Sequence, residues 1–89
     1  MEKRDREKSK APLTALKQGE AGTVESIRGG HRKGGGFEKR LMDMGLTPGT
    51  VVTVVKSAPF HGPLEVLVRG SRLALGRGMA ERIVVEIEK

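Results

Sequence analysis

The side chains able to support acid–base or metal chemistry are few in this sequence, and they are scattered along it. The two histidines, His31 and His61, lie in separate glycine-containing segments, and cysteine is absent. A metal site needs several ligands that converge on one point, and only the fold could bring these histidines together with Glu38 or Asp43. Catalysis needs a nucleophile with a base, or carboxylates paired in a pocket. We therefore expect solvated histidines, no metal, no cofactor and no catalytic residue, so a binding module is favoured over an enzyme.

The segment GGHRKGGG, residues 29–36, resembles a phosphate-binding loop in composition but fits neither common pattern. A Walker loop places Gly-Lys-Ser/Thr at the start of a helix, whereas Lys33 is followed by Gly34. No G-x-G-x-x-G of the dinucleotide-binding type fits either. We expect a solvated connector that carries Arg28, His31, Arg32 and Lys33, and an anion at the start of the following helix stays open.

Charge and composition restrict the partners without selecting one. The formal net charge of +6 favours acidic partners such as nucleic acid, anionic lipid or an acidic protein surface. The chain contains two Phe and no Trp or Tyr, so stacking platforms for single-stranded nucleic acid are missing. No apolar run approaches the roughly 18 residues of a membrane span, and no secretory signal is visible. We expect a cytoplasmic protein.

The strongest local signal lies in residues 37–50, FEKRLMDMGLTPGT. Phe37, Arg40, Leu41 and Met44 share the i, i+3, i+4, i+7 spacing of one helix face. Gly45 then suits a left-handed position after the helix, and Leu46 suits the apolar contact of a Schellman cap. Continuation is blocked by Pro48, which makes a turn with Gly49. The pattern predicts a helix of two to three turns that stops sharply before a strand.

The remaining elements are short strands. We expect residues 1–10 to form a disordered charged tail, because they contain no aliphatic residue after Met1. Residues 13–16 suit a single helical turn. Strands are predicted over residues 21–28, 51–56, 64–69, 72–75 and 83–88, with a bulge near Glu25 and Ser26 and a two-residue turn at Gly70-Ser71. Residues 76–80 are predicted to make one turn.

This arrangement is mostly β: five short strands, one short α-helix inserted between strands 1 and 2, and a tight hairpin between strands 3 and 4. Short strands with glycine-rich turns in one small domain, residues 11–89, favour a small closed barrel that protects its edges. The SH3-like barrel fits best. The OB-fold competes, but its helix normally comes between later strands.

The sequence resembles the FeoA-domain family over nearly everything after Lys10. The most specific part is RLMDMGLTPGT, in which Arg40, Leu41, Met44, Gly45, Leu46, Pro48 and Gly49 form the structural motif. The other matching residues are Leu13, Leu16, Gly19, Gly22, Pro63, Val66, Gly70, Leu73, Ala74, Leu75, Ala80, Ile83, Val84 and Val85. The loop at residues 29–36 departs from the family pattern by being longer and more basic, and its role stays open.

The resemblance implies an SH3-like barrel without enzymatic activity. It also implies a partner, the cytosolic GTPase-containing part of the ferrous iron transporter FeoB, and hence a peripheral place at the membrane. No nucleic acid is expected, although RNA or DNA binding by a small basic barrel is the alternative. A regulatory domain like those fused to metal-dependent repressors is a third interpretation, and self-association stays open.

Two surfaces are candidates for the partner contact. One is the outward helix face with Glu38, Lys39, Met42 and Asp43, where Met42 lies off the apolar stripe and an exposed Met would be an adaptable contact. Ordinary solubilising charge explains that face equally well. The other surface is the loop with Pro59, Phe60 and His61. The sequence leaves open whether Phe60 folds back onto the core or is exposed. Without Tyr or Trp, a polyproline groove is not expected.

Overall fold

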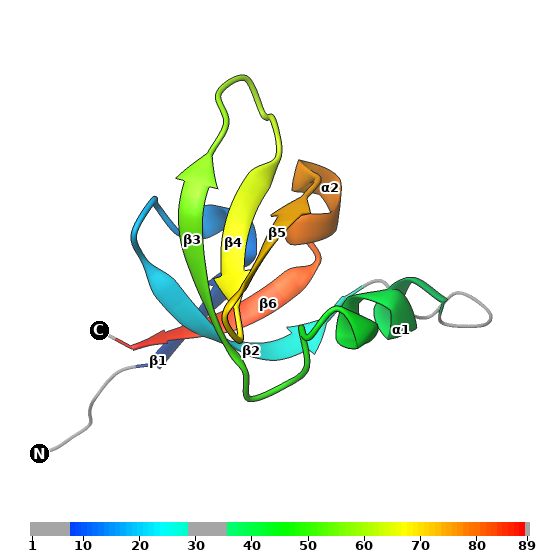
Figure 1. The fold of residues 1–89 in the computed structure, drawn as a ribbon. Helices are drawn as coiled ribbons and strands as arrows, with labels where there is room; N and C mark the ends of the chain where they lie inside the picture. The colour runs from blue at the N-terminus through cyan, green and yellow to red at the C-terminus, as the bar shows by residue number, and fades with distance from the viewer. Residues whose placement is uncertain (1–7, 29–35, 89) are drawn as a thin grey trace, which may run out of the picture.

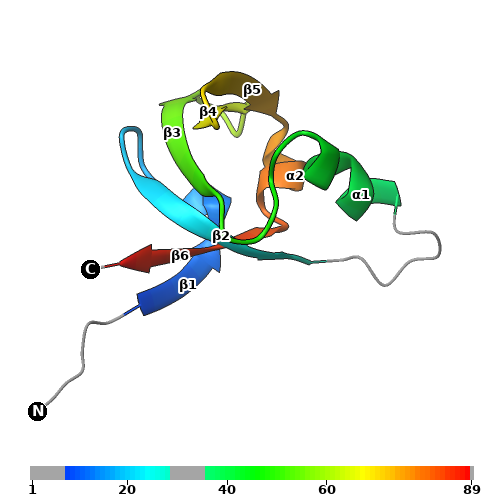
Figure 2. The same cartoon turned by 60° about the horizontal axis from the view of Figure 1, so that its bottom comes forward.

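A computed structural model describes residues 8–28 and 36–88 of the chain. The elements are strand β1 (Lys8–Pro12), the 3-10 turn η1 (Leu13–Ala15), strand β2 (Ala21–Ile27), helix α1 (Gly36–Asp43), strands β3 (Val51–Ser57), β4 (Leu64–Val68) and β5 (Ser71–Leu75), helix α2 (Arg77–Ala80) and strand β6 (Ile83–Glu88). The strands form one antiparallel sheet in the order β1-β6-β2-β3-β4-β5. Figures 1 and 2 show that this sheet is strongly curved.

The core fills the inside of the curved sheet, because alternate residues of each strand point to one face. Leu64, Val66 and Val68 of β4 are buried, as are Ile83 and Val85 of β6, which confirms the alternation expected from the sequence. The two short turns η1 and α2 contact each other and contribute the buried residues Leu13 and Ala80. The expected mostly β architecture is confirmed.

The sheet has six described strands where five were expected, because β1 occupies the end of the predicted tail. Residues 1–7 lie outside the described residues, but Lys8–Pro12 pairs with β6 in register from Lys8 opposite Glu88 to Pro12 opposite Val84. Backbone pairing with β6 holds residues 8–10 in the strand although none of them is aliphatic. Lys10 Nζ also reaches across β6 to Glu25 Oε2 on β2, 2.7 Å away, and this hydrogen bond raises the pKa of Lys10. The expectation of disorder is therefore wrong for residues 8–10.

Two local features of the strands test the sequence-based expectations directly. The register of β2 against β6 shifts between Val24 and Ser26, and both Val24 and Ile27 are buried, so the predicted bulge is confirmed. The predicted position of the turn between β4 and β5, Gly70-Ser71, is wrong by one residue. Val68 pairs with Ser71, which leaves Arg69 and Gly70 at the turn positions. Both have positive φ, 51° and 83°, as a type I′ turn requires. The residue missed was Arg69, since glycine alone signalled the turn.

Helix α1 lies between β2 and β3, at the predicted place in the chain (Figure 1). Leu46 N–H donates to Leu41 O at 3.0 Å and Gly45 N–H donates to Met42 O at 2.9 Å, the two bonds of a Schellman cap. Gly45 has φ of +100°, so the predicted left-handed position is confirmed. Leu41 and Leu46 are both fully buried.

Candidate functional site

The part of the chain that the structure describes holds no cluster of metal-binding side chains. Residues 8–28 and 36–88 contain no group of three or more His, Cys, Asp or Glu placed to hold a metal ion. His61 is exposed, and Asp43 is exposed beside Lys39, 3.8 Å from its ammonium. His31 and the phosphate-loop candidates at residues 29–35 lie outside the described residues. In those same described ranges, no helix is both long and apolar enough to cross a membrane.

The helix motif of residues 40–49 is used by the fold itself. Thr50 N–H donates to Thr47 O at 3.1 Å with Gly49 at φ +93°, which makes Pro48 and Gly49 the central residues of a type II turn. Gly49 N–H in turn donates to Val24 O at 2.8 Å, so the turn is fastened to β2. Leu41, Gly45, Leu46, Pro48 and Gly49 therefore hold α1 and the start of β3 in place.

The outward face of α1 offers less than the sequence suggested. Met42 was expected to be exposed, but it is half-buried and packs against the core, as does Met44. At 100° per residue the two side chains bracket Leu41 over an arc of roughly 160°, so the covered side of the helix is wider than one apolar stripe. Arg40, Lys39 and Asp43 are exposed. The Lys39–Asp43 pair is an i, i+4 pair in solvent, worth about 0.3–0.5 kcal/mol. The side chains of Phe37 and Glu38 are outside the described part.

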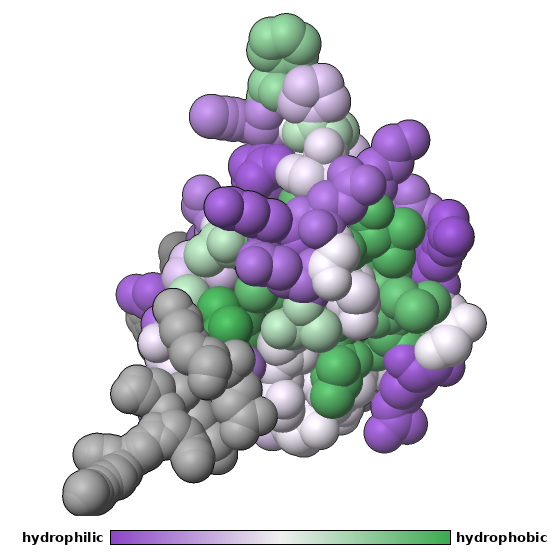
Figure 3. Space-filling view, turned by 90° about the vertical axis from the view of Figure 1, so that its left-hand side faces the viewer, coloured by the Kyte–Doolittle hydropathy of each residue, from purple (hydrophilic) through white to green (hydrophobic). Residues whose placement is uncertain are grey.

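The second candidate surface is the loop between β3 and β4, residues 58–63, which we call the Phe60 loop. It projects from one end of the sheet (Figure 1), and its tip stands out as an apolar projection in Figure 3. The Phe60 side chain is 96% exposed, which decides between the two orientations that the sequence left open. Ala58 N–H donates to Pro63 O and Gly62 N–H donates to Pro59 O, both at 3.1 Å. The loop is thus a closed turn with Phe60 and His61 at its centre.

Arg77 of α2 fastens the Phe60 loop to the rest of the molecule. Its Nε donates to Gly62 O at 3.1 Å, and its Nη2 donates to Ser57 Oγ at 3.2 Å and to Ala58 O at 3.5 Å. These partners lie 15 to 20 residues earlier in the chain. Sequence reasoning missed this residue, because a lone arginine in GRGMA carries no signal of such a tertiary contact.

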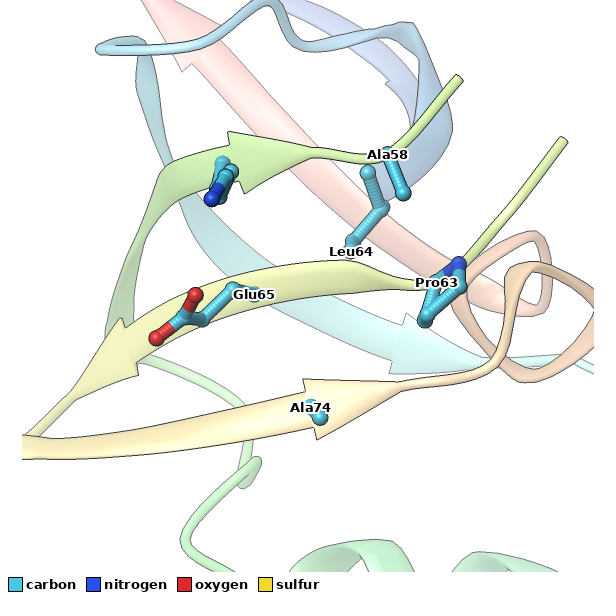
Figure 4. A pocket seen from close by; sticks show the side chains of 6 residues that line it. Ala58, Pro63, Leu64, Glu65 and Ala74 are labelled. Carbon is cyan, nitrogen blue, oxygen red and sulfur yellow. The ribbon is translucent and has the colours of Figure 1, made fainter. Parts of the chain in front are cut away.

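Two hollows flank the Phe60 loop. The first, about 240 Å³, lies on the outer face of β3, β4 and β5 (Figure 4) and is lined by Lys56, Ala58, Pro63, Leu64, Glu65 and Ala74. The second is wider and is lined by Thr14, Ala58, Phe60, His61, Arg77 and Glu81. The first is smaller than the roughly 300–1,000 Å³ of typical small-molecule sites, whereas the second, about 610 Å³, falls within that range. Ala58 lines both hollows, so the loop and its flanks form one continuous surface.

Replacing Arg77 by alanine should lower the free energy of unfolding by about 1–2 kcal/mol, because charge-assisted hydrogen bonds to partly buried carbonyls are lost. Urea unfolding followed by far-UV circular dichroism measures this loss, and hydrogen exchange at the Ala58 and Gly62 amides should become faster. Arg72→Ala is the matched control: it removes only an exposed cross-strand pair with Glu65, 3.2 Å long, and should cost less than about 1 kcal/mol. Equal effects of the two changes would contradict a clamping role for Arg77.

Comparison with known sequences identifies relatives over most of the chain. The model of the FeoA domain matches residues 11–87. The Fe(2+) transport protein A homologue of Methanocaldococcus jannaschii is 36% identical over 75 residues, which cover 84% of each chain. A Porphyromonas gingivalis protein, a fusion of Fe(2+) transport protein A with the Fe(2+) transporter FeoB, is 31% identical over 75 residues. That match covers 84% of this chain and 8% of the fusion protein.

Solved structures agree with the sequence comparison. The crystal structure of an iron uptake regulatory protein, FeoA, superposes with a TM-score of 0.76 at 38% identity and covers 89% of this chain and 100% of that one. The Stenotrophomonas maltophilia FeoA, crystallised with zinc, superposes with a TM-score of 0.72 at 31% identity, covering 83% and 87%. It is described as a prokaryotic SH3 domain protein and as a candidate ferrous iron transport activating factor. The expected SH3-like fold is confirmed.

Proposed function

The chain belongs to the FeoA domain family, and from this we propose that it is a non-enzymatic accessory protein of ferrous iron uptake. It acts by binding the cytosolic, GTPase-containing part of a FeoB-type transporter. The protein works in the cytoplasm and reaches the membrane through this partner. Neither a cofactor nor a resident metal is part of the proposal.

The observation that carries the proposal is the match to a segment of a fusion protein that also contains FeoB. Joining two domains in one polypeptide keeps them at a millimolar effective concentration when the linker is short and flexible. A fusion is useful when the joined parts act together, which supports binding between the separate chains. It also indicates that the affinity need not be high, because a modest interface is sufficient at such local concentrations.

The arrangement of side chains is consistent with binding rather than catalysis. In residues 8–28 and 36–88, no group of three or more His, Cys, Asp or Glu is placed to hold a metal ion, while the Phe60 loop and its flanking hollows offer a shaped surface. Both sequence-derived candidate surfaces stay predictions for the partner contact: Lys39, Met42 and Asp43 on α1, and Pro59, Phe60 and His61 on the loop.

Titration calorimetry with the cytosolic domain of FeoB tests the proposal. We expect one-to-one binding with a Kd of roughly 1–100 µM in at least one of three states of the GTPase: nucleotide-free, GDP-bound or bound to a GTP analogue. Absence of heat in all three states at several hundred micromolar would contradict it. Binding to RNA in place of FeoB, with an affinity that falls steeply with salt, would support the nucleic-acid alternative instead.

A further inference from the structure

Phe60 contributes almost no contact to the fold that carries it. Its side chain is 96% exposed, and the chain contains only two Phe and no Trp or Tyr. An aromatic ring removes a large apolar area from water when it is buried, about 150–250 Å². Leaving it in water gives up that stabilisation, so its presence at the loop tip has no explanation in the stability of the domain.

The backbone is strained at Phe60 and at the following residue, His61. Phe60 has φ of 57° and His61 has φ of 60°, and they are the central residues of the turn closed by the Gly62 N–H bond to Pro59 O. Positive φ at both central positions defines a type I′ turn, for which Asn-Gly is the preferred pair. Bulky L-residues are disfavoured there because Cβ approaches the following carbonyl oxygen. The chain thus keeps Phe and His where Asn and Gly would relieve the backbone.

The loop is closed by hydrogen bonds and close packing despite this strain. A Cβ on Gly62 would lie 2.8 Å from Ala58 Cβ and 3.1 Å from Pro59 O, so the turn is closed tightly around glycine. From outside the loop, Arg77 binds Gly62 O, Ala58 O and Ser57 Oγ. Because these contacts hold the backbone of the loop, the ordering cost on binding is largely confined to the side-chain torsions of the ring, which favours affinity.

The surroundings of Phe60 have the layout of a small protein-binding surface. The hollow on the side of β3–β5 combines apolar Ala58, Pro63 and Ala74 with the charged groups of Lys56 and Glu65 (Figure 4). The wider hollow adds polar and charged groups from η1, the loop and α2. Interface hot spots commonly combine an aromatic side chain with a neighbouring apolar surface and a surrounding rim of polar residues.

We propose that Phe60 is the anchor of the partner contact and inserts into an apolar pocket on the folded cytosolic part of FeoB. This inference rests on the proposed function and adds the residue and the kind of pocket that it requires. A protein pocket is favoured over a lipid surface because Phe60 is the one exposed large apolar side chain that the described residues place at this end of the sheet. The other exposed large apolar residues in the described part are Val51 and Leu67. They lie toward the ends of β3 and β4 that are far from the Phe60 loop.

The experiment separates recognition from stability by using two type I′ turns of the same protein. The double variant Phe60→Asn/His61→Gly relieves the strained loop and removes the ring, whereas Arg69→Asn relieves the turn between β4 and β5 and leaves the ring in place. Phe60→Ala, a third variant, removes the ring alone. Binding of the full chain is measured to FeoB in nanodiscs, to empty nanodiscs of the same lipid and, by sedimentation, to itself.

Both turn variants should melt higher than the wild type, by roughly 4–8 °C or more for each relieved turn in a domain of this size. The double variant and Phe60→Ala should bind FeoB at least about 30-fold more weakly, while Arg69→Asn should bind within about twofold of the wild type. A more stable variant that has lost binding cannot be explained by unfolding.

Unchanged binding of FeoB by the double variant and by Phe60→Ala would overturn this inference and leave the proposed function standing. No binding by the wild type would overturn both. Equal, Phe60-dependent binding to empty nanodiscs would replace the protein pocket by a lipid surface, and Phe60-dependent self-association would replace it by a second copy of the chain.

Discussion

Replacing Leu41 by alanine is expected to lower the free energy of unfolding by about 2–5 kcal/mol, the range for a buried Leu→Ala change. Leu41 is fully buried on α1, and its carbonyl also accepts the cap bond from Leu46. Small domains have about 5–15 kcal/mol of stability in total. The variant should therefore be marginal, with its melting temperature lowered by roughly 8 °C or more.

Far-UV circular dichroism in urea is the suitable measurement for Leu41→Ala, because the chain has no Trp or Tyr to report by fluorescence. Met42→Ala is the control on the same turn of helix: Met42 is half-buried, so its truncation should cost clearly less. If Leu41→Ala left the unfolding midpoint close to that of the wild type, α1 would be a unit that detaches without unfolding the sheet. That result would contradict its place in the common core.

The parts of the fold that could be predicted from the sequence are those set by local pattern. Alternation in LEVLV and IVVEIE fixed which side of β4 and β6 is buried. Opposite parity of Val24 and Ile27 required the bulge that the β2–β6 register contains. Glycine followed by Leu and Pro placed the end of α1, because few residue types tolerate the backbone that a Schellman cap needs.

The parts that could not be predicted depend on contacts between distant segments. Strand β1 has no apolar pattern and is held by the backbone of β6, so the residues Lys8–Pro12 by themselves do not predict a strand. Arg69 occupies a left-handed turn position that arginine disfavours, so the turn of the hairpin lies one residue earlier than predicted. The half-burial of Met42 follows from the way α1 sits on the core, and the Arg77 clamp follows from the way α2 meets the Phe60 loop.

The candidate site shows the same division. The sequence indicated Phe60 only as a rare aromatic in a loop with two prolines, and its exposure and strained backbone are visible only in the structure. The helix motif, by contrast, was the clearest signal in the sequence, yet its residues are occupied by caps, turns and core contacts. The feature that identifies the family therefore differs from the feature that we propose to bind the partner.

Gly45→Ala should show directly how strictly geometry dictates the family motif. Alanine at φ of +100° is strained, and its Cβ would lie 3.3 Å from Val68 Cγ1 and 3.7 Å from Arg69 Cδ. We expect a loss of about 1–3 kcal/mol in the free energy of unfolding, from the backbone and the crowding together. Urea unfolding of the wild type and the variant measures it.

Gly49→Ala is the matched control, because Gly49 has a similar φ of +93° with nothing within 4 Å of its added Cβ. It should lose only the backbone part, about 1 kcal/mol. The difference between the two variants then isolates the crowding against Val68. Equal losses would mean that β4 yields to the new methyl group at no cost, and no loss at Gly45 would show that the cap does not hold α1.

If both losses appear while binding of FeoB by the folded fraction is unchanged, the motif serves the fold alone, because Gly45 and Gly49 then act only through the backbone that they permit.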